Sequence, residues 1–359
     1  MTLKPALSAY LDCLRFTAAF AVLLGHMDQD GLSMAWMPLS RFSHDAVVIF
    51  FVLSGFIIYY STTTRTHNWR EYVVLRLSRI YSVALPAVLI CISLALVLAS
   101  QPDFDPSRYS NYSPVSIWHT VSSLLFLNQS WMNEAELVLN IPYWSLCYEV
   151  WFYVLFGAWY FTNGWRRIAW VAVAALVAGP SILLLMPIWL IGAWLAASRN
   201  YAVHMSPAKA WLAFFGPLVL IVFINLLKID TLIQHSLYQL IPGYWRLENA
   251  QRFVTDYLIG AALCLHIASF SSLPLAFQKW FERFQWFWAL LAGFSFTLYL
   301  FHRPMTQWLG ANFPISSGQV LQSTFVALAI LIVCWLISFG TEKRLRAWRR
   351  SLARLLGTT

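Results

Sequence analysis

Ten long apolar segments, separated by short polar ones, limit what this chain can fold into more than any other feature of its sequence. Most of them are close to the ~20 residues that a helix needs to cross a bilayer. They occupy residues 9–27, 44–62, 80–99, 144–161, 168–179, 181–198, 209–227, 252–270, 286–308 and 320–340. Of the 359 residues, 60% are hydrophobic and 11% are charged, against roughly 25% charged residues in soluble domains. The sequence therefore predicts an all-α, polytopic membrane helix bundle of about ten transmembrane helices.

Two boundaries in this layout need their own argument. Residues 168–198 form one apolar tract, which we divide at Gly179-Pro180 because a helix break and that length together fit a tight hairpin. Residues 115–127 are apolar but too short to cross a bilayer comfortably. We therefore expect a re-entrant or interfacial helix at 115–127.

Basic residues are distributed unevenly among the connecting segments. With the N-terminus placed inside, most of the 24 lysines and arginines lie in cytoplasmic segments, as the positive-inside rule requires. Topology thus explains the net charge of +9, which in a soluble protein would suggest nucleic acid as a partner; none is expected here. We predict cytoplasmic termini, a membrane domain over 1–341 and a basic cytoplasmic tail over 342–359. Such a tail serves as a topology anchor or lies as an amphipathic helix on anionic lipid.

The sequence gives no indication of a metal site or of a permanently bound cofactor. Its five cysteines are scattered and lack disulfide or metal-ligand spacing. The Walker A, GxSxG, HExxH and CxxC signatures are missing. An HxxxDG pattern at residues 26–31 occurs in soluble acyltransferases of unrelated fold, and we give it little weight in this setting.

Ionisable residues inside the apolar segments are the candidates for chemistry, because each costs roughly 2.5 to 3.5 kcal/mol to insert. Arg15 and His26 are eleven residues apart, which places them on one face of a helix about 16 Å apart along its axis. Glu149 has no basic neighbour in sequence and needs a partner in space. We predict that Glu149 holds one nitrogen of His26 and raises the basicity of the other. Alternatively, Arg15 is a snorkelling anchor, His26 an interfacial polar residue and His302 a structural histidine.

A second pattern points to an anion. Arg76 and Arg79 are three residues apart at the start of the third segment, so both guanidinium groups share one helix face. Guanidinium pairs bind phosphate through paired hydrogen bonds. Basic residues at a cytoplasmic helix end also serve topology alone, which is the competing interpretation.

Together these residues resemble the membrane acyltransferase 3 family, whose members acylate cell-surface glycans and other hydroxylated acceptors. The resemblance covers most of the chain. The motifs that carry it are Arg15 with His26, the segment 50–56 with Ser54, Arg76-x-x-Arg79, Trp144-Ser145-Leu146 with Glu149, and 295–304 with Tyr299 and His302. One departure is Phe296, which stands where the family often has Tyr.

The resemblance implies roles for individual residues. His26 would be the catalytic histidine, with Glu149 as its catalytic partner. Arg76 and Arg79 would meet the phosphates of an acyl-coenzyme A donor that enters from the cytoplasm, with Arg15 as a further donor-binding residue. The possible substrate-binding residues are Ser54, Trp144, Tyr299 and His302.

The sequence thus favours an enzyme of the inner (plasma) membrane that moves an acyl group, expected to be acetyl, from acyl-CoA to a hydroxyl. The expected acceptor is a cell-surface or exported polysaccharide or its lipid-linked precursor. Membrane lipids and polysaccharide-assembly proteins are the other expected partners. The alternatives are acylation of a small hydroxylated metabolite, a secondary transporter, or a non-catalytic member of a polysaccharide-export assembly.

Overall fold

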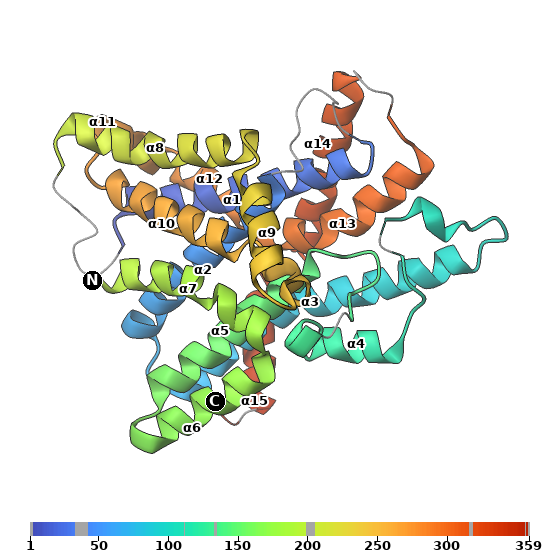
Figure 1. Cartoon of the computed structure of the whole chain (residues 1–359), viewed down its shortest axis with the longest axis horizontal. Helices are drawn as coiled ribbons and strands as arrows, with labels where there is room; N and C mark the ends of the chain where they lie inside the picture. Colours follow the sequence, from blue (N-terminus) through green and yellow to red (C-terminus); the bar gives the residue numbers. More distant parts are fainter. Residues whose placement is uncertain are drawn as a thin grey trace.

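A computed structural model of the chain describes residues 3–32, 42–110, 112–132, 135–198, 205–315, 319–355 and 357. This part of the chain is helical and contains no strand (Figure 1). Its helices are α1 (Pro5–Gln29), α2 (Phe42–Arg65), α3 (Trp69–Ala99), α4 (Ile117–Leu124), α5 (Tyr143–Phe161), α6 (Gly164–Ala178), α7 (Pro180–Ala197), α8 (Pro207–Leu226), α9 (Ile229–Leu240), α10 (Phe253–Phe270), α11 (Leu275–Arg283), α12 (Gln285–Ala292), α13 (Ser295–Asn312), α14 (Val320–Ser338) and α15 (Leu345–Leu355). The all-α prediction is confirmed.

Every predicted apolar segment contains helix, and seven helical stretches of the described chain are long and apolar enough to cross a membrane. They are α1, α2, α3, α7, α8, Tyr244–Phe270 and Val320–Leu355. Helix α6 has only 15 residues, and α5 is rich in Tyr and Trp, which lowers its hydropathy. The predicted segment 286–308 is divided between α12 and α13. The number of about ten spans and the cytoplasmic side of the termini stay predictions.

The break predicted at Gly179-Pro180 is confirmed. Helix α6 ends at Ala178 and α7 begins at Pro180. Gly179 has a φ of +86°, a conformation that glycine adopts without steric cost. A proline at the first helical position loses no hydrogen bond, since that N–H would have no helical partner.

The short apolar segment at 115–127 forms the eight-residue helix α4, which is too short to span. Ile117 and Trp118 on this helix are 85% and 59% exposed. Its place at a membrane interface stays a prediction.

Helices α2 and α7 pack with their backbones almost in contact. A Cβ atom on Gly55 would lie 1.9 Å from the carbonyl oxygen of Trp189, and one on Gly192 would lie 2.0 Å from that of Val52. Glycine at both positions lets two membrane helices approach this closely. Gly55, in the middle of α2, is therefore explained by packing.

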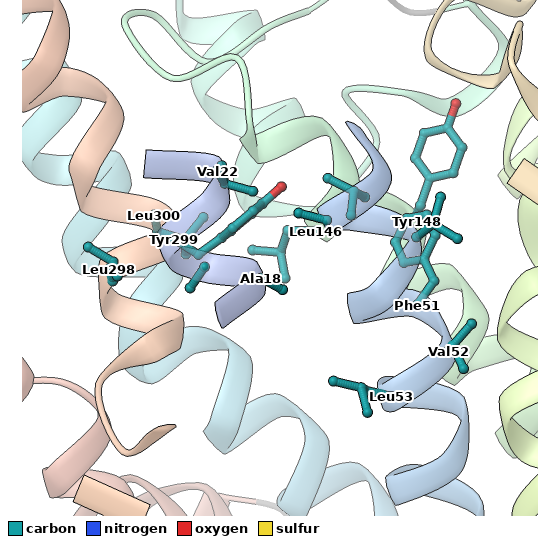
Figure 2. Close-up of a cluster of buried hydrophobic side chains, with 14 of the residues drawn as sticks. Ala18, Val22, Phe51, Val52, Leu53, Leu146, Tyr148, Leu298, Tyr299 and Leu300 are labelled. Atoms are coloured by element: carbon teal, nitrogen blue, oxygen red, sulfur yellow. The ribbon is translucent and has the colours of Figure 1, made fainter. Parts of the chain in front are cut away.

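Four helices meet around the middle of the bundle and position the candidate site (Figure 2). Ala18 and Val22 of α1 lie between Leu146 of α5 and Leu298 of α13 in a core of buried apolar side chains. Phe51 of α2 packs edge-on against Phe152 of α5, with ring centroids 5.2 Å apart. The polar residues described next project from these same four helices and from α3.

The predicted basic tail contains a 3-10 turn, Glu342–Arg344, followed by α15, which packs against α3. The Glu342 carboxylate accepts hydrogen bonds of 2.9 Å from both the backbone N–H and the hydroxyl of Thr297 at the start of α13. The tail is therefore attached to the bundle at two helices. Its boundary as a separate domain stays a prediction.

Candidate active site

A cavity of about 60 Å³ lies where α1, α2, α3, α5 and α13 converge. One water needs roughly 10 to 15 Å³ of such space, so the cavity has room for a few waters. Its polar lining comes from residues far apart in the sequence. These are Arg15, Ser54, Arg79, Ser145, Glu149, Tyr153, Ser295 and Tyr299.

Glu149 is the centre of a hydrogen-bond network in this cavity. Its Oε1 accepts a 2.6 Å bond from the Ser54 hydroxyl and a second bond from the Tyr153 hydroxyl. The indole N–H of Trp189 donates to Ser54 Oγ at 3.2 Å. Arg15 lies within electrostatic range of Glu149 and of Arg79.

The predicted hydrogen bond between Glu149 and His26 is wrong, because Glu149 accepts from Ser54 and Tyr153 instead. The His26 ring faces His302 instead, with His26 Nδ1 2.8 Å from His302 Nε2 and the ring centroids 5.0 Å apart. The depth of Glu149 along α5 was compatible with either arrangement. What decides is helix rotation, because the face of α5 that carries Glu149 points to α2, whereas α13 brings His302 to α1.

The histidine pair has a defined proton arrangement when both rings are neutral. His302 Nδ1 lies 2.9 Å from the carbonyl oxygen of Leu298, and a carbonyl only accepts, so this nitrogen carries the proton. His302 Nε2 is then an acceptor, and His26 Nδ1 must donate to it. The Nε2 of His26 is left with its lone pair, which is the form a general base requires. His302 thus takes the orienting role predicted for Glu149.

A buried ion pair lies beside the histidines. Arg303, which is 1% exposed, pairs with the carboxylate of Asp30 at the end of α1 and donates to Ser110 Oγ at 2.7 Å. Gly310 lets α13 approach this point, since a Cβ there would lie 2.3 Å from the Asp30 carbonyl oxygen. The pair fixes α1 to α13 one turn beyond His26.

The three predicted donor-binding arginines fall into two groups. Arg15 and Arg79 line the cavity. Arg76 lies outside the cavity lining, with its side chain over the Tyr72 ring at 5.2 Å and Nη2 2.9 Å from Ser61 Oγ. The i, i+3 spacing therefore places Arg76 and Arg79 on one side of α3 but in different surroundings.

Of the four possible substrate-binding residues, two line the cavity and two do not. Ser54 and Tyr299 line the cavity, and the Tyr299 hydroxyl lies 2.6 Å from Ser145 Oγ. His302 pairs with His26. Trp144 is buried among rings, with the His44 and Trp144 centroids 5.9 Å apart, and is not part of the cavity lining.

Sequence reasoning missed Asp30, Arg303 and Tyr153. The HxxxDG pattern contains Asp30. The usable signal was Arg303, because an arginine inside a membrane segment needs a counter-ion and Asp30 is an acid at the end of another apolar segment. Tyr153 follows Glu149 by one helical turn, which brings the two side chains together. This spacing was a usable signal.

Within the described ranges, no group of three or more His, Cys, Asp or Glu side chains is arranged to hold a metal ion.

Comparisons with known proteins agree with the type of chemistry that the site can perform. The family model described as an acyltransferase domain, that of the acyltransferase 3 family, matches residues 8–339. The chain belongs to this family, and the family predicted from the sequence is confirmed. It is a membrane-type family, which fits the apolar helices described above.

One curated relative is Acyltransferase MdmB from Streptomyces mycarofaciens, 29% identical over 224 residues. The match covers 58% of this chain and 52% of MdmB, so it spans about half the length of that relative. No solved structure matches the chain.

Proposed function

We propose that this protein is a membrane O-acyltransferase that moves an acyl group, expected to be acetyl, from acyl-CoA to a hydroxyl of a surface or exported polysaccharide or its lipid-linked precursor. The observation that carries the proposal is the oriented histidine pair of α1 and α13. The pair lies outside the cavity lining but near it, since the rings of His302 and the cavity-lining Tyr299 are 6.3 Å apart, and the cavity contains two guanidinium groups. Membership of an acyltransferase family supports it. The location expected for such an enzyme is the inner membrane.

Acyl transfer from a thioester requires the protein to bind both substrates and to accept and return one proton. In this scheme His26 Nε2 removes the proton of the acceptor hydroxyl as its oxygen attacks the thioester carbonyl carbon. The tetrahedral intermediate expels the coenzyme A thiolate, which takes the proton from His26. His302 holds the His26 ring throughout and is a positioning residue. Glu149 holds the Ser54 and Tyr153 hydroxyls in the cavity.

The oxyanion must be stabilised by side chains in this scheme. Backbone N–H groups near Ser54-Gly55 are not available for this role, because both residues lie inside α2, where each N–H donates to the carbonyl four residues earlier. Arg15 and Tyr299 are the candidates, because both line the cavity. A guanidinium group in a dry site stabilises developing negative charge strongly.

The test compares a deletion strain complemented with wild type, His26→Ala or His235→Ala. His235 is an exposed histidine on α9 and serves as the matched control. Ester-linked acyl groups on purified surface polysaccharide are measured by proton NMR, with equal membrane levels of each variant verified by immunoblot. We expect esters with wild type and His235→Ala and their loss with His26→Ala.

Two results would contradict the proposal. Full esterification with His26→Ala would remove His26 from the chemistry. Ester levels that are unchanged in the deletion strain would remove the polysaccharide as acceptor, and small hydroxylated metabolites would then be assayed with labelled acetyl-CoA.

A further inference from the structure

The tail helix α15 carries an arginine toward the arginines of α3. Arg349 lies within electrostatic range of Arg79, and Arg76 within range of Arg349. This follows from the packing of α15 along α3. The residues matched by the family model end at 339, so Arg349 comes from a segment outside the matched domain.

The resulting cluster holds three positive charges, and its acids lie on one side: Asp12 and Glu342 are within electrostatic range of Arg79. The charged neighbours within range of Arg76 are Arg79 and Arg349, and those of Arg349 are Arg79 and Arg346. Like charges at such range repel, and the repulsion destabilises the folded chain unless an anion lies between them.

An independent observation also points to a ligand. Arg76 is 8% exposed, and in the part of the chain that the structure describes its Nε has no hydrogen-bond partner. An unpaired buried donor costs about 1 to 3 kcal/mol, more for a charged group. A phosphate oxygen would satisfy it, because guanidinium groups bind phosphate with paired, charge-assisted hydrogen bonds.

The position of the cluster agrees with a donor that reaches the cavity. Arg79 belongs both to the cluster and to the cavity lining. A ligand with phosphates on the cluster could therefore extend a chain from Arg79 toward Glu149. A nucleotide thioester, with phosphates at one end and the acyl group at the other, has this form.

We propose that Arg349 of the tail helix completes, with Arg76 and Arg79, a binding site for the phosphate groups of the acyl-CoA donor. The proposal rests on the proposed function, because it takes acyl-CoA as the donor. Anionic lipid offers the same phosphate chemistry to a basic amphipathic helix, so the experiment must separate the two sources.

The experiment measures coenzyme A binding by calorimetry to the full-length protein in nanodiscs made of zwitterionic lipid. Arg349→Ala is compared with Arg350→Ala. Arg350 is the next residue in sequence, and its side chain points about 100° away from that of Arg349 around the axis of α15. We expect Arg349→Ala to weaken binding about tenfold to a hundredfold, the range for a hydrogen bond to a charged group. Arg350→Ala should stay within about twofold of wild type.

A second variant separates binding from a merely structural role. Arg349→Glu places an anion next to Arg76 and Arg79, so it should raise the thermal unfolding temperature and also abolish coenzyme A binding. Loss of binding together with a lower unfolding temperature would overturn the proposal, since the residue would then act through the fold.

The remaining outcomes are equally decisive. Equal affinity in Arg349→Ala and Arg350→Ala, with wild type binding coenzyme A, would overturn the role of Arg349 and leave the proposed function intact. If Arg349→Ala binds coenzyme A as wild type does and differs from it only in unfolding temperature in nanodiscs that contain phosphatidylglycerol, the phosphate belongs to lipid and the inference is wrong. If wild type binds no coenzyme A, the donor in the proposed function fails, and the role of Arg349 fails with it.

Discussion

The two polar regions along α1 differ in how their charges are compensated. Around His26 the groups contact one another directly, since His26 pairs with His302, and Arg303 pairs with Asp30 and Ser110 and leaves only its Nε without a partner among the described residues. Around Arg15 the contacts are looser, because Asp12 is 3.7 Å away, Glu149 and Glu342 act on it only within electrostatic range, and Arg79 lies within range to repel it. A completed network fixes a side chain in one orientation, whereas an incomplete one has room for a ligand. We infer that the first region positions a base and the second receives the substrate.

The largest effect is expected from breaking the ion pair of the completed region. Arg303→Ala leaves the Asp30 carboxylate buried without an opposite charge, with the Thr306 hydroxyl as its remaining hydrogen-bond partner; breaking a buried pair in this way costs about 3 to 5 kcal/mol in folding free energy. Thermal unfolding in detergent measures this loss, with the exposed Arg166→Ala as control. Removing both charges, in Asp30→Asn with Arg303→Gln, should recover part of it. A loss no larger than that of Arg166→Ala would contradict the idea that this region is held by its charges.

The next effect concerns catalysis. His302→Leu removes the acceptor that holds His26 Nδ1–H, so kcat should fall by about 100-fold, the lower end of what general base catalysis contributes. KM should stay unchanged, because His302 does not line the cavity. His302→Gln should restore part of kcat, since an amide oxygen can accept the same hydrogen bond. An unchanged kcat in His302→Leu would show that catalysis does not depend on His302 holding the His26 ring.

A smaller effect is expected in the cavity. Glu149→Gln keeps an oxygen that accepts from Ser54 and Tyr153 but removes the charge that strengthens those bonds. The transfer rate should fall by about tenfold, and stability should fall by about 1 kcal/mol, the difference between a charge-assisted and a neutral hydrogen bond. Rate and unfolding temperature are measured on the same preparation. If the rate falls as far as in His302→Leu, the pairing of Glu149 with His26 would return as the better explanation.

The smallest effect is expected at Tyr299. Its hydroxyl bridges Ser145 Oγ at 2.6 Å and the Pro142 carbonyl at 3.1 Å. Tyr299→Phe should cost about 0.5 to 1.5 kcal/mol in stability, the net value of such a hydrogen bond. The exposed Tyr238→Phe is the control in the same unfolding assay. If Tyr299→Phe leaves the stability unchanged, waters in the cavity replace the hydroxyl.

The sequence predicted the features that depend on local spacing. Apolar runs located the helices, and Gly179-Pro180 located a helix break, because a left-handed glycine and a proline without N–H determine the backbone there. The recognised motifs also gave the family correctly. Spacing along α3 put Arg76 and Arg79 on one side of the helix, but it did not indicate that Arg79 lines the cavity while Arg76 lies outside its lining.

Features that depend on helix rotation were not predicted. The bond between His26 and His302 joins residues 276 positions apart in the sequence, and the side chain that His26 meets depends on how α13 is rotated. The same holds for Glu149, whose face on α5 turns to Ser54. No spacing within one helix contains this information.

The close packing of α2 and α7 has a consequence for substrate entry. Their backbones meet at Gly55 and Gly192, so these two helices cannot shift against each other without a backbone clash. Ser54, next to Gly55, lies on this rigid pair. The cavity of about 60 Å³ is far too small for coenzyme A, so the donor of the proposed function could enter only after helices around the cavity move apart. In such a movement Ser54 would keep its position on α2, and the displacement would fall to the other helices that line the cavity.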